Sequence, residues 1–354
     1  MSKIEILSSQ KEYTVSFSSG LSDFISEDFF YVIDKAVIDN PLVANFDLER
    51  TIFVDGSEQT KTIEFCSHLI SELASRGVTR KSSLVAIGGG SVQDAATLTA
   101  SLYMRGIPWF FVPTTFMAMT DSCVGGKSAI NVGKFKNLAG NFYPPNEIRI
   151  EEFFLNSLPI SAISSGLSEA IKIQIAKGPE SFRNFKSTYS EYRLESDTSK
   201  LLSIAMMTLN SKKWFIEIDE YDKKERQLLN YGHSFGHALE SASGMAIPHG
   251  LAIGVGMLVA NSLVPTNGYL TEVNAIVFEI LRESKFDFNE IKIDLARFSA
   301  ALRLDKKNTK NEQVLILLDG QNQLQVSSFE LSESRLEEQK DVLLRVLSEL
   351  GRVS

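Results

Sequence analysis

Apolar and polar positions follow a regular order over residues 1–150 of the chain. Four apolar runs have the composition of buried strands, and they stand at Phe30–Ile33, Thr51–Val54, Leu84–Ile87 and Trp109–Val112. Between the second and third runs, apolar residues recur at helical spacing from about Gln59 to Arg76. This alternation of strands and helices predicts a parallel β-sheet covered by helices on both faces.

The pattern changes near Tyr143-Pro144-Pro145, because two prolines fit neither a helix interior nor a central strand. Helical periodicity then dominates, in stretches at Ile160–Lys177, Thr198–Glu217, Gln227–Ala242 and Gly250–Leu263. One short apolar run, Gln313–Leu318, predicts a further strand. The sequence therefore predicts an α/β domain over residues 1–150 and a mostly α-helical domain over residues 151–354. The length of 354 residues agrees, since one core rarely exceeds roughly 250–300 residues.

The composition is that of a globular protein with a net charge of −8. This charge argues against broad binding to nucleic acid or acidic membranes, although a local cluster of cations could still bind an anionic metabolite. The N-terminal residues lack the apolar run of a signal peptide, and no stretch approaches the roughly 18 apolar residues of a membrane span. Cys66 and Cys123 form no CxxC pair, so we expect a cytoplasmic protein without a disulfide scaffold.

A glycine-rich turn follows the third predicted strand. Leu84–Ile87 runs directly into Gly88-Gly89-Gly90-Ser91, and a helix is predicted from about Val92. This geometry lets a pyrophosphate approach the backbone N–H groups of a helix N-terminus. The triplet is not the GxGxxG fingerprint, and a tight turn without a ligand is the alternative. Asp34 ends the first strand, where its carboxylate could accept from ribose hydroxyls, which favours the nucleotide interpretation.

Three of the four histidines fall close together at His233, His237 and His249. The first two are spaced i, i+4 and share a helix face. A catalytic zinc site usually has three protein ligands, and Glu169, on an otherwise apolar helix, is the best candidate for a carboxylate ligand. The alternative makes Glu169 and Lys172 an exposed ion pair and the histidines core residues.

Cations gather around two polar, glycine-rich stretches, Asp121–Lys127 and Asn131–Asn137. Such stretches are typical of binding loops. The other candidate cations are spread along the chain at Arg105, Lys212, Arg226, Lys306 and Lys307. Any one of them alone would be a solvated surface charge. Together they could neutralise a phosphate and a carboxylate in one cleft.

A series of motifs in these segments resembles dehydroquinate synthase and its sugar-phosphate cyclase relatives. The motifs are GGGSVQDAA, YMRG, VPTT, DSCVGGKSAIN, KNLAGNFYPP, GLSEAIK, LLNYGHSFGHALE, PHG and LDKK, in the order expected of that family. The resemblance covers about Asp34 to Lys307. It implies an N-terminal Rossmann-like NAD domain and a helical C-terminal metal domain, with the active site between them.

The resemblance also implies site residues. Zn²⁺ (or Co²⁺) would be bound by Glu169, His233 and His249. NAD would contact Asp34, Glu58, Lys61, Gly89, Gly90, Ser91, Asp94, Thr114, Thr115, Lys127, Lys136, Phe154, Leu155, Asn156 and Ser157. The catalytic residues would be Lys127, Lys172, Lys212, Arg226, Asn230 and His237. Arg105, Asp121, Asn137 and Lys307 would bind substrate, with Arg105 reaching in from the partner subunit of a homodimer.

The implied reaction is that of a carbon–oxygen lyase acting on an anionic sugar phosphate. NAD removes and later returns one hydride, phosphate leaves, and an intramolecular aldol step closes a carbocycle. Arg226 and Asn230 stand where the family binds a carboxylate, which favours the substrate of dehydroquinate synthase over neutral sugar phosphates. Tyr231, Pro144-Pro145, Phe135 and Leu251 depart from that pattern. A metal-dependent polyol dehydrogenase and a non-catalytic NAD-binding protein are the other hypotheses.

Overall fold

The computed structural model describes residues 2–18, 20–133, 135–195 and 197–351. The chain forms two compact units, the first comprising Met1–Leu158 with Lys212–Glu220 and the second Pro159–Ser211 with Tyr221–Ser354. The assignment of nucleotide binding to residues 1–150 and of metal binding to residues 151–354 stays a prediction at this point.

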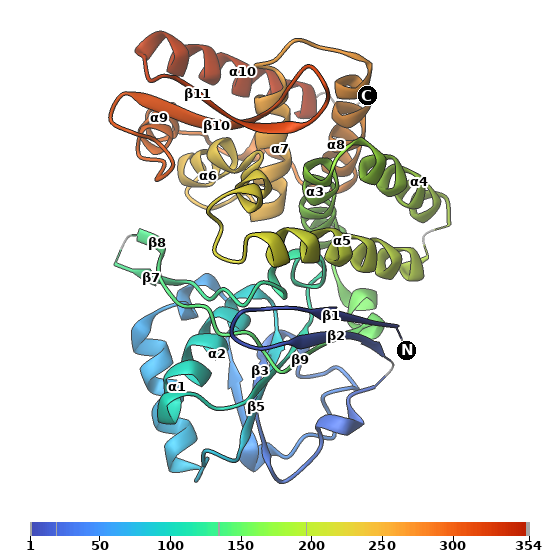
Figure 1. The fold of residues 1–354 in the computed structure, drawn as a ribbon, viewed down its shortest axis with the longest axis vertical. Helices are drawn as coiled ribbons and strands as arrows, with labels where there is room; N and C mark the ends of the chain where they lie inside the picture. Colours follow the sequence, from blue (N-terminus) through green and yellow to red (C-terminus); the bar gives the residue numbers. More distant parts are fainter. Residues whose placement is uncertain (1, 19, 134, 196, 352–354) are drawn as a thin grey trace. The chain divides into compact units, whose positions relative to one another are not determined.

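The first unit is built on a seven-stranded sheet (Figure 1). Its strand order is β1-β2-β9-β6-β5-β3-β4, and every neighbouring pair is parallel except β1 with β2. The strands are β1 (Ser2–Ile6), β2 (Tyr13–Ser18), β3 (Phe29–Asp34), β4 (Thr51–Val54), β5 (Ser83–Gly88), β6 (Trp109–Pro113) and β9 (Glu147–Glu151). The four strands expected from apolar runs are present, which confirms the prediction of a mostly parallel sheet.

Two helices accompany this sheet, α1 (Ile63–Ser75) and α2 (Gly90–Leu102). The single helix predicted from Gln59 to Arg76 is wrong at its start, because a separate 3₁₀ turn, η4 (Glu58–Thr60), precedes α1. The break arises at Lys61 and Thr62. The Lys61 carbonyl accepts from the Asn131 N–H at 2.7 Å, and the extended Thr62 caps α1 by accepting from the Phe65 N–H.

Shorter elements complete the first unit. An antiparallel ribbon consists of β7 (Ile130–Val132) and β8 (Phe135–Ala139), and every residue of β8 is exposed. Single turns occur at η1 (Ser22–Phe24), η2 (Lys35–Val37), η3 (Leu48–Arg50), η5 (Tyr103–Arg105) and η7 (Glu152–Ser157), with a π-helical turn at η6 (Ala118–Ser122).

The second unit is mostly helical, as predicted. Its helices are α3 (Ile160–Lys177), α4 (Pro179–Glu195), α5 (Thr198–Ile218), α6 (His233–Ala242), α7 (His249–Asn261), α8 (Gly268–Glu283), α9 (Leu295–Arg303) and α10 (Glu333–Gly351), with turns η8 (Glu225–Asn230) and η9 (Phe288–Glu290). The end of α5, from Lys212, groups with the first unit. Strand β10 (Glu312–Leu318) confirms the predicted strand and pairs with β11 (Leu324–Glu330).

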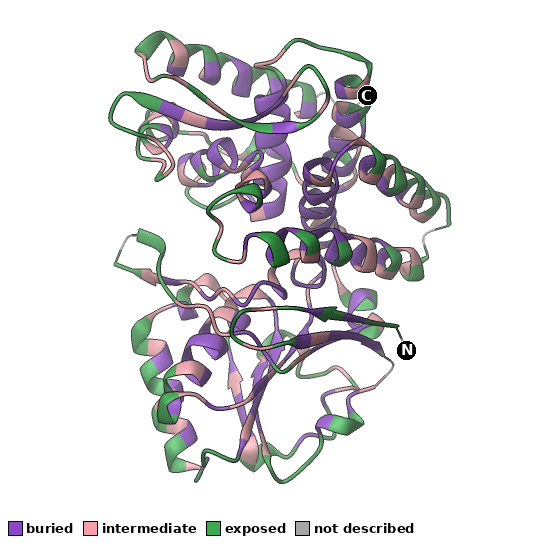
Figure 2. Ribbon diagram, in the orientation of Figure 1, coloured by how far each residue is buried: buried purple, intermediate pink, exposed green. Residues whose placement is uncertain are grey.

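Helix α7 forms the centre of the second unit, and its residues from Gly250 to Asn261 are all buried (Figure 2). It packs against α3, α6, α8 and α10. An apolar helix with no polar face is stable only when neighbours surround it, and these four helices supply that environment. Among the described residues, no helix combines the length and apolar character that crossing a bilayer requires.

The predicted helix Gln227–Ala242 is wrong in its middle. The structure has η8 up to Asn230 and starts α6 at His233, and between them Gly232 adopts a left-handed conformation with φ of 76°. A Cβ atom at Gly232 would also lie 2.9 Å from the Ile253 carbonyl oxygen. Glycine is therefore needed at this position both for its backbone conformation and for the close approach of α7.

Candidate functional site

Close packing of α3 against the start of α7 positions the candidate metal ligands. A Cβ atom at Gly250 would lie 2.2 Å from the Ser165 carbonyl oxygen, so only glycine lets these two helices approach to this distance. The contact places His249, the first residue of α7, near Glu169 on α3. The turn at Gly232 directs His233 toward the same place from α6.

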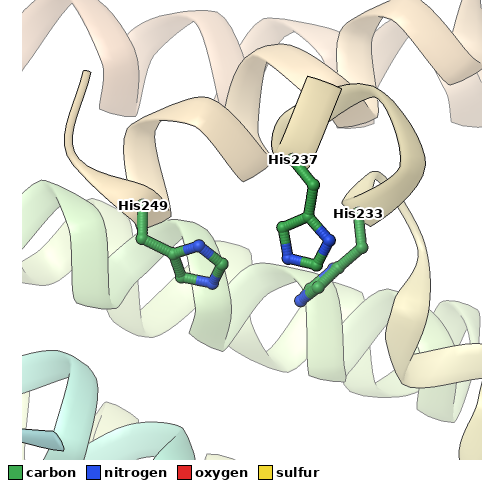
Figure 3. A group of neighbouring side chains, drawn as sticks. All are labelled: His233, His237 and His249. Carbon is green, nitrogen blue, oxygen red and sulfur yellow. The ribbon is translucent and has the colours of Figure 1, made fainter. Parts of the chain in front are cut away.

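The three histidines face a common space (Figure 3). Each offers a ring nitrogen, and these nitrogens lie within 4.8 Å of one another. Glu169 also reaches this space, with its Oε1 atom 3.4 Å from Nε2 of His249 and 3.9 Å from Nε2 of His233. The structure thus brings together four possible ligands, the predicted set of Glu169, His233 and His249 and in addition His237.

Glu169 has the features of a carboxylate built to bind a cation. Its side chain is fully buried, and its Oε1 atom has no hydrogen-bond partner. Its other oxygen accepts from the ammonium of Lys172, which is also buried. Burial alone would raise the pKa of Glu169, but Lys172 and His249 hold it well below its usual range. The carboxylate therefore stays ionised, and the alternative of an exposed Glu169–Lys172 ion pair is wrong.

One ring nitrogen of His233 and one of His249 are held by the protein. Nδ1 of His233 lies 3.2 Å from the Tyr231 carbonyl oxygen, which leaves Nε2 directed toward Glu169. Nδ1 of His249 lies 3.3 Å from Oε2 of Glu240. This arrangement is what metal-binding histidines usually show. Sequence reasoning missed Glu240, although its spacing of i+3 from His237 on one helix was a usable signal.

The ionisation of the histidines follows from their neighbours. Burial lowers the pKa of His233 well below its usual value, with Lys172 and the other two histidines adding to the effect. Burial also acts to lower the pKa of His249, but the Glu169 and Glu240 carboxylates outweigh it and raise the value to about 10. His249 lies at the N-terminus of α7, where the positive end of the helix dipole also disfavours a protonated ring, and the two carboxylates outweigh this effect as well.

His237 is the most exposed of the three histidines. Surrounding protein and the positive charge of His249 nevertheless lower its pKa to about 4, so its ring is neutral at neutral pH. Lys307 also acts on this pKa, and it is held by Asp305, whose carboxylate lies 3.0 Å from its ammonium. The structure thus brings the predicted substrate residue Lys307 near enough to His237 for its charge to act on the imidazole.

Arg226 and Asn230, the predicted carboxylate-binding residues, both lie on the turn η8. Arg226 is only 4% exposed, and Asn230 donates from Nδ2 to the Gln227 carbonyl oxygen at 3.1 Å. A buried guanidinium on a short turn is expensive to desolvate, which is typical of a functional position.

In the first unit, Asp34 and the glycine-rich turn, both predicted to contact NAD, stand at the carboxyl ends of β3 and β5. The chain proceeds from β3 to one edge at β4 and from β5 in the opposite direction to β6, so the order reverses between these adjacent strands. Such a reversal is where open parallel sheets bind ligands. Asp34 ends β3, and Gly89, Gly90 and Ser91 begin α2 directly after β5.

Small residues keep the start of α2 open. A Cβ atom at Gly89 would lie 3.1 Å from the Thr115 side chain, and Thr114 donates its backbone N–H to the Gly88 carbonyl oxygen. Asp34 accepts from the Gly56 and Ala36 N–H groups through Oδ1. In the turn η7, Phe154 and Leu155 are buried, whereas Asn156 and Ser157 are exposed.

A polar network joins several residues that the resemblance assigned to NAD and substrate. The Lys61 ammonium lies 2.9 Å from Asp94, 3.6 Å from Glu58 and 2.8 Å from the Asn137 amide oxygen. Lys136 lies 3.9 Å from the same Glu58 carboxylate. Burial raises the pKa of Asp94, and the charge of Lys61 opposes this effect. The structure therefore brings these five predicted residues together.

The remaining predicted cations are placed differently. Lys212 pairs with Asp121 and is 6% exposed. The Lys127 ammonium lies 6.0 Å from the centre of the Phe142 ring. Arg105 is exposed at the end of η5, where Met104, Arg105 and Gly106 all have positive φ.

Comparison with known proteins agrees with this geometry. Residues 51–165 match the 3-dehydroquinate synthase N-terminal domain, and residues 166–308 match the 3-dehydroquinate synthase C-terminal domain. The chain belongs to the 3-dehydroquinate synthase family. A 3-dehydroquinate synthase from Sulfurovum sp. is 34% identical over 80% of this chain and 84% of its own length. Other curated 3-dehydroquinate synthases match at 32–36% identity. The predicted resemblance is confirmed.

Solved structures show that this member of the 3-dehydroquinate synthase family has the fold of sugar-phosphate cyclases. A 2-deoxy-scyllo-inosose synthase, complexed with carbaglucose-6-phosphate, NAD⁺ and Co²⁺, superposes with a TM-score of 0.80 at 22% identity and covers 98% of this chain and 100% of its own. A 2-epi-5-epi-valiolone synthase from Streptomyces hygroscopicus with NAD⁺ and Zn²⁺ bound has a TM-score of 0.79 at 22% identity, covering 97% and 99%.

Proposed function

We propose that this protein converts 3-deoxy-D-arabino-heptulosonate 7-phosphate to 3-dehydroquinate and releases phosphate. The observation that carries the proposal is the unsatisfied Oε1 atom of Glu169, which faces Nε2 of His233 and of His249 in a chain of this family. A buried, ionised carboxylate oxygen without a partner is costly unless a cation completes its environment.

These residues fit a divalent metal ion. One carboxylate and two imidazoles supply a catalytic zinc with three protein ligands and leave a position for substrate. Cobalt accepts the same ligand types, and the related cyclase structures contain Co²⁺ or Zn²⁺. We assign Glu169, His233 and His249 as ligands and keep His237 for the substrate.

We assign NAD to the carboxyl ends of β3 and β5, with Asp34 at the ribose and the start of α2 at the pyrophosphate. Glu58, Lys61, Asp94 and Lys136 would border this site through their polar network. The other NAD contacts predicted from the resemblance, at Thr114, Thr115, Lys127 and Phe154–Ser157, are part of the same proposal. NAD⁺ is present in both related cyclase structures.

When bound, the metal would supply Lewis acidity and NAD a reversible hydride transfer. The chain's own residues would bind and orient the anionic substrate. Lys307, held by Asp305, and neutral His237 suit the phosphate group, since an ammonium and an imidazole N–H can both donate to its oxygens. Lys127, Lys172 and Lys212, with Asp121, Asn137 and Arg105, complete the proposed set.

Arg226 and Asn230 decide the proposed substrate class. A guanidinium binds a carboxylate with two parallel hydrogen bonds, and an amide N–H beside it adds a third donor. The main alternative is a cyclase for a neutral-headed sugar phosphate, such as sedoheptulose 7-phosphate. Tyr231 and Pro144-Pro145, which are closer to the secondary-metabolic cyclases, favour that alternative, whereas the buried guanidinium of Arg226 suits a carboxylate.

The test is incubation of the purified protein with the candidate sugar phosphates, with NMR of the products and a phosphate assay. We expect 3-dehydroquinate and one phosphate per product. NAD should be needed only in catalytic amounts, because the hydride is returned in each turnover. Steady accumulation of NADH with product would instead support a polyol dehydrogenase, and preference for sedoheptulose 7-phosphate would support the alternative cyclase.

Two further proposals concern the assembly of the protein and its location in the cell. We propose a homodimer in which Arg105 acts in the partner's site, and sedimentation together with complementation between Arg105 and ligand variants tests it. A cytoplasmic location is supported by two buried cysteines with free thiols, which a reducing compartment preserves. Fractionation of cells that express the protein tests this proposal.

A further inference from the structure

Glu240 is a buried carboxylate beside the histidine group that has no role in the proposed function so far. It lies on α6, seven residues after His233 and three after His237, and therefore on the same helix face. Its side chain is 11% exposed, and its Oε2 atom lies 3.3 Å from Nδ1 of His249. A carboxylate in this position costs desolvation energy, so its contact with His249 needs an explanation.

The two ring nitrogens of His249 face two different carboxylates. Nδ1 faces Glu240, and Nε2 faces the unsatisfied Oε1 of Glu169 at 3.4 Å. A neutral imidazole carries its proton on one nitrogen and a lone pair on the other. When a metal ion displaces the Nε2 proton, the hydrogen bond from Nδ1–H to Glu240 keeps the remaining proton on Nδ1, and the lone pair on Nε2 is directed toward the proposed metal position.

His233 provides an internal comparison. Its Nδ1 faces the neutral carbonyl oxygen of Tyr231, so the backbone fixes its ring. His249 lies at the first position of α7, and its Nδ1 faces a charged side chain from another helix. A charged acceptor makes a stronger hydrogen bond than a neutral one and makes the imidazole a better electron donor.

We propose that Glu240 is a positioning residue that fixes the tautomer and the ring orientation of His249 for metal binding. The inference rests on the proposed metal centre. It assigns Glu240 no contact with substrate or nucleotide. The opposing explanation is that Glu240 only ties α6 to the start of α7 and stabilises the fold.

The experiment measures metal affinity rather than turnover. Metal-free wild type, Glu240→Gln and Glu240→Ala proteins are titrated with Zn²⁺ in competition with a chromophoric chelator, and with Co²⁺ while its visible absorption is recorded. Loss of such a partner typically weakens metal affinity about 10–100-fold. For Glu240→Gln we expect a loss of metal affinity near the lower end of this range, because its amide oxygen can still accept from Nδ1–H. For Glu240→Ala we expect a loss of metal affinity near the upper end and an altered Co²⁺ spectrum.

Glu283→Gln is the matched control. Glu283 is a partly buried glutamate of the same unit that accepts from Tyr189 and pairs with Arg193. This variant makes the same chemical change away from the histidines, so its metal affinity should equal that of wild type. Thermal unfolding of each metal-free protein measures any loss of stability separately.

Two outcomes decide against the inference. If both Glu240 variants bind Zn²⁺ as wild type does, while their metal-free forms unfold at lower temperature, Glu240 has only a structural role. If they lose no more affinity than Glu283→Gln, the positioning role is likewise rejected. Failure of the underlying metal centre looks different, because wild type and His249→Ala would then bind Zn²⁺ equally weakly.

Discussion

The Lys61 ammonium lies 2.9 Å from the carboxylate of Asp94, and both side chains are largely buried. Burial raises the pKa of Asp94 above its unfolded value, with Lys61 opposing the shift. A carboxyl with a raised folded-state pKa favours folding at low pH. That contribution is lost as the pH rises from the unfolded pKa through the folded one.

Replacing Lys61 with Met should therefore destabilise the protein most at neutral pH. The variant leaves the buried carboxylate of Asp94 without its cation, which lowers the free energy of unfolding by about 3–5 kcal/mol. Without Lys61 the folded-state pKa of Asp94 rises further, so the loss of stability extends to higher pH. Urea unfolding at several pH values measures the effect. The double variant Lys61→Met/Asp94→Asn should recover part of the loss. Equal stability of Lys61→Met and wild type at pH 7 would contradict the prediction.

The proposed ligand set predicts the metal content of four variants. Glu169→Ala, His233→Ala and His249→Ala should each bind little metal, because each loses one of three ligands. His237→Ala should keep the metal and lose about 10²–10⁴-fold in kcat, since its neutral ring acts on the substrate. Elemental analysis of the purified variants decides the question. A metal-free His237→Ala beside a metal-loaded Glu169→Ala would mean that the three histidines are the ligands.

Arg226→Ala should lower kcat/KM for the carboxylate substrate by about two to three orders of magnitude, which corresponds to about 3–4 kcal/mol of lost charge-assisted binding. Arg226→Lys is the matched variant, because it keeps the charge and loses the planar fork. It should recover only part of the activity. Steady-state kinetics with 3-deoxy-D-arabino-heptulosonate 7-phosphate gives the result, and an unchanged kcat/KM in Arg226→Ala would show that Arg226 does not bind the substrate carboxylate.

Gly250→Ala should weaken both the fold and the metal site. The new Cβ would lie 2.2 Å from the Ser165 carbonyl oxygen, so α7 must shift from α3 and carry His249 away from Glu169. We expect a loss of about 1–3 kcal/mol in the free energy of unfolding and weaker Zn²⁺ binding. Gly268→Ala, where a Cβ meets nothing within 4 Å, is the control and should not lower stability. Denaturant unfolding and Zn²⁺ titration of both variants test the prediction.

Much of the fold was predictable because its elements carry continuous patterns. The buried runs at β3, β4, β5 and β6 and the helix α3 follow directly from apolar spacing. Strand β9 was missed because charged residues alternate with Ile148 and Ile150. Arg149 is nevertheless buried there, since it pairs with Asp23 and Glu147 and lies 4.4 Å from the centre of the Phe24 ring. Only tertiary partners make such a strand stable, and spacing does not reveal them.

The candidate site was predictable in its residue types but not in its supporting contacts. The spacing of His233 and His237 indicated one helix face, yet the break at Gly232 depends on the approach of α7 from a later part of the chain. Glu240 is missed for the same reason, because its partner His249 begins another helix. Contacts between helices decide these details, and a periodic pattern describes only one helix at a time.

Glu169, His233 and His249 come from three helices that are widely separated in the sequence. During synthesis the carboxylate leaves the ribosome long before either imidazole, so the growing chain has no complete set of donors for most of its translation. The proposed ion would enter only after α7 has been made and has settled beside α3. Binding of the ion is thus a late step in the maturation of the protein. Cells starved of zinc or cobalt should accumulate folded chains that lack the ion.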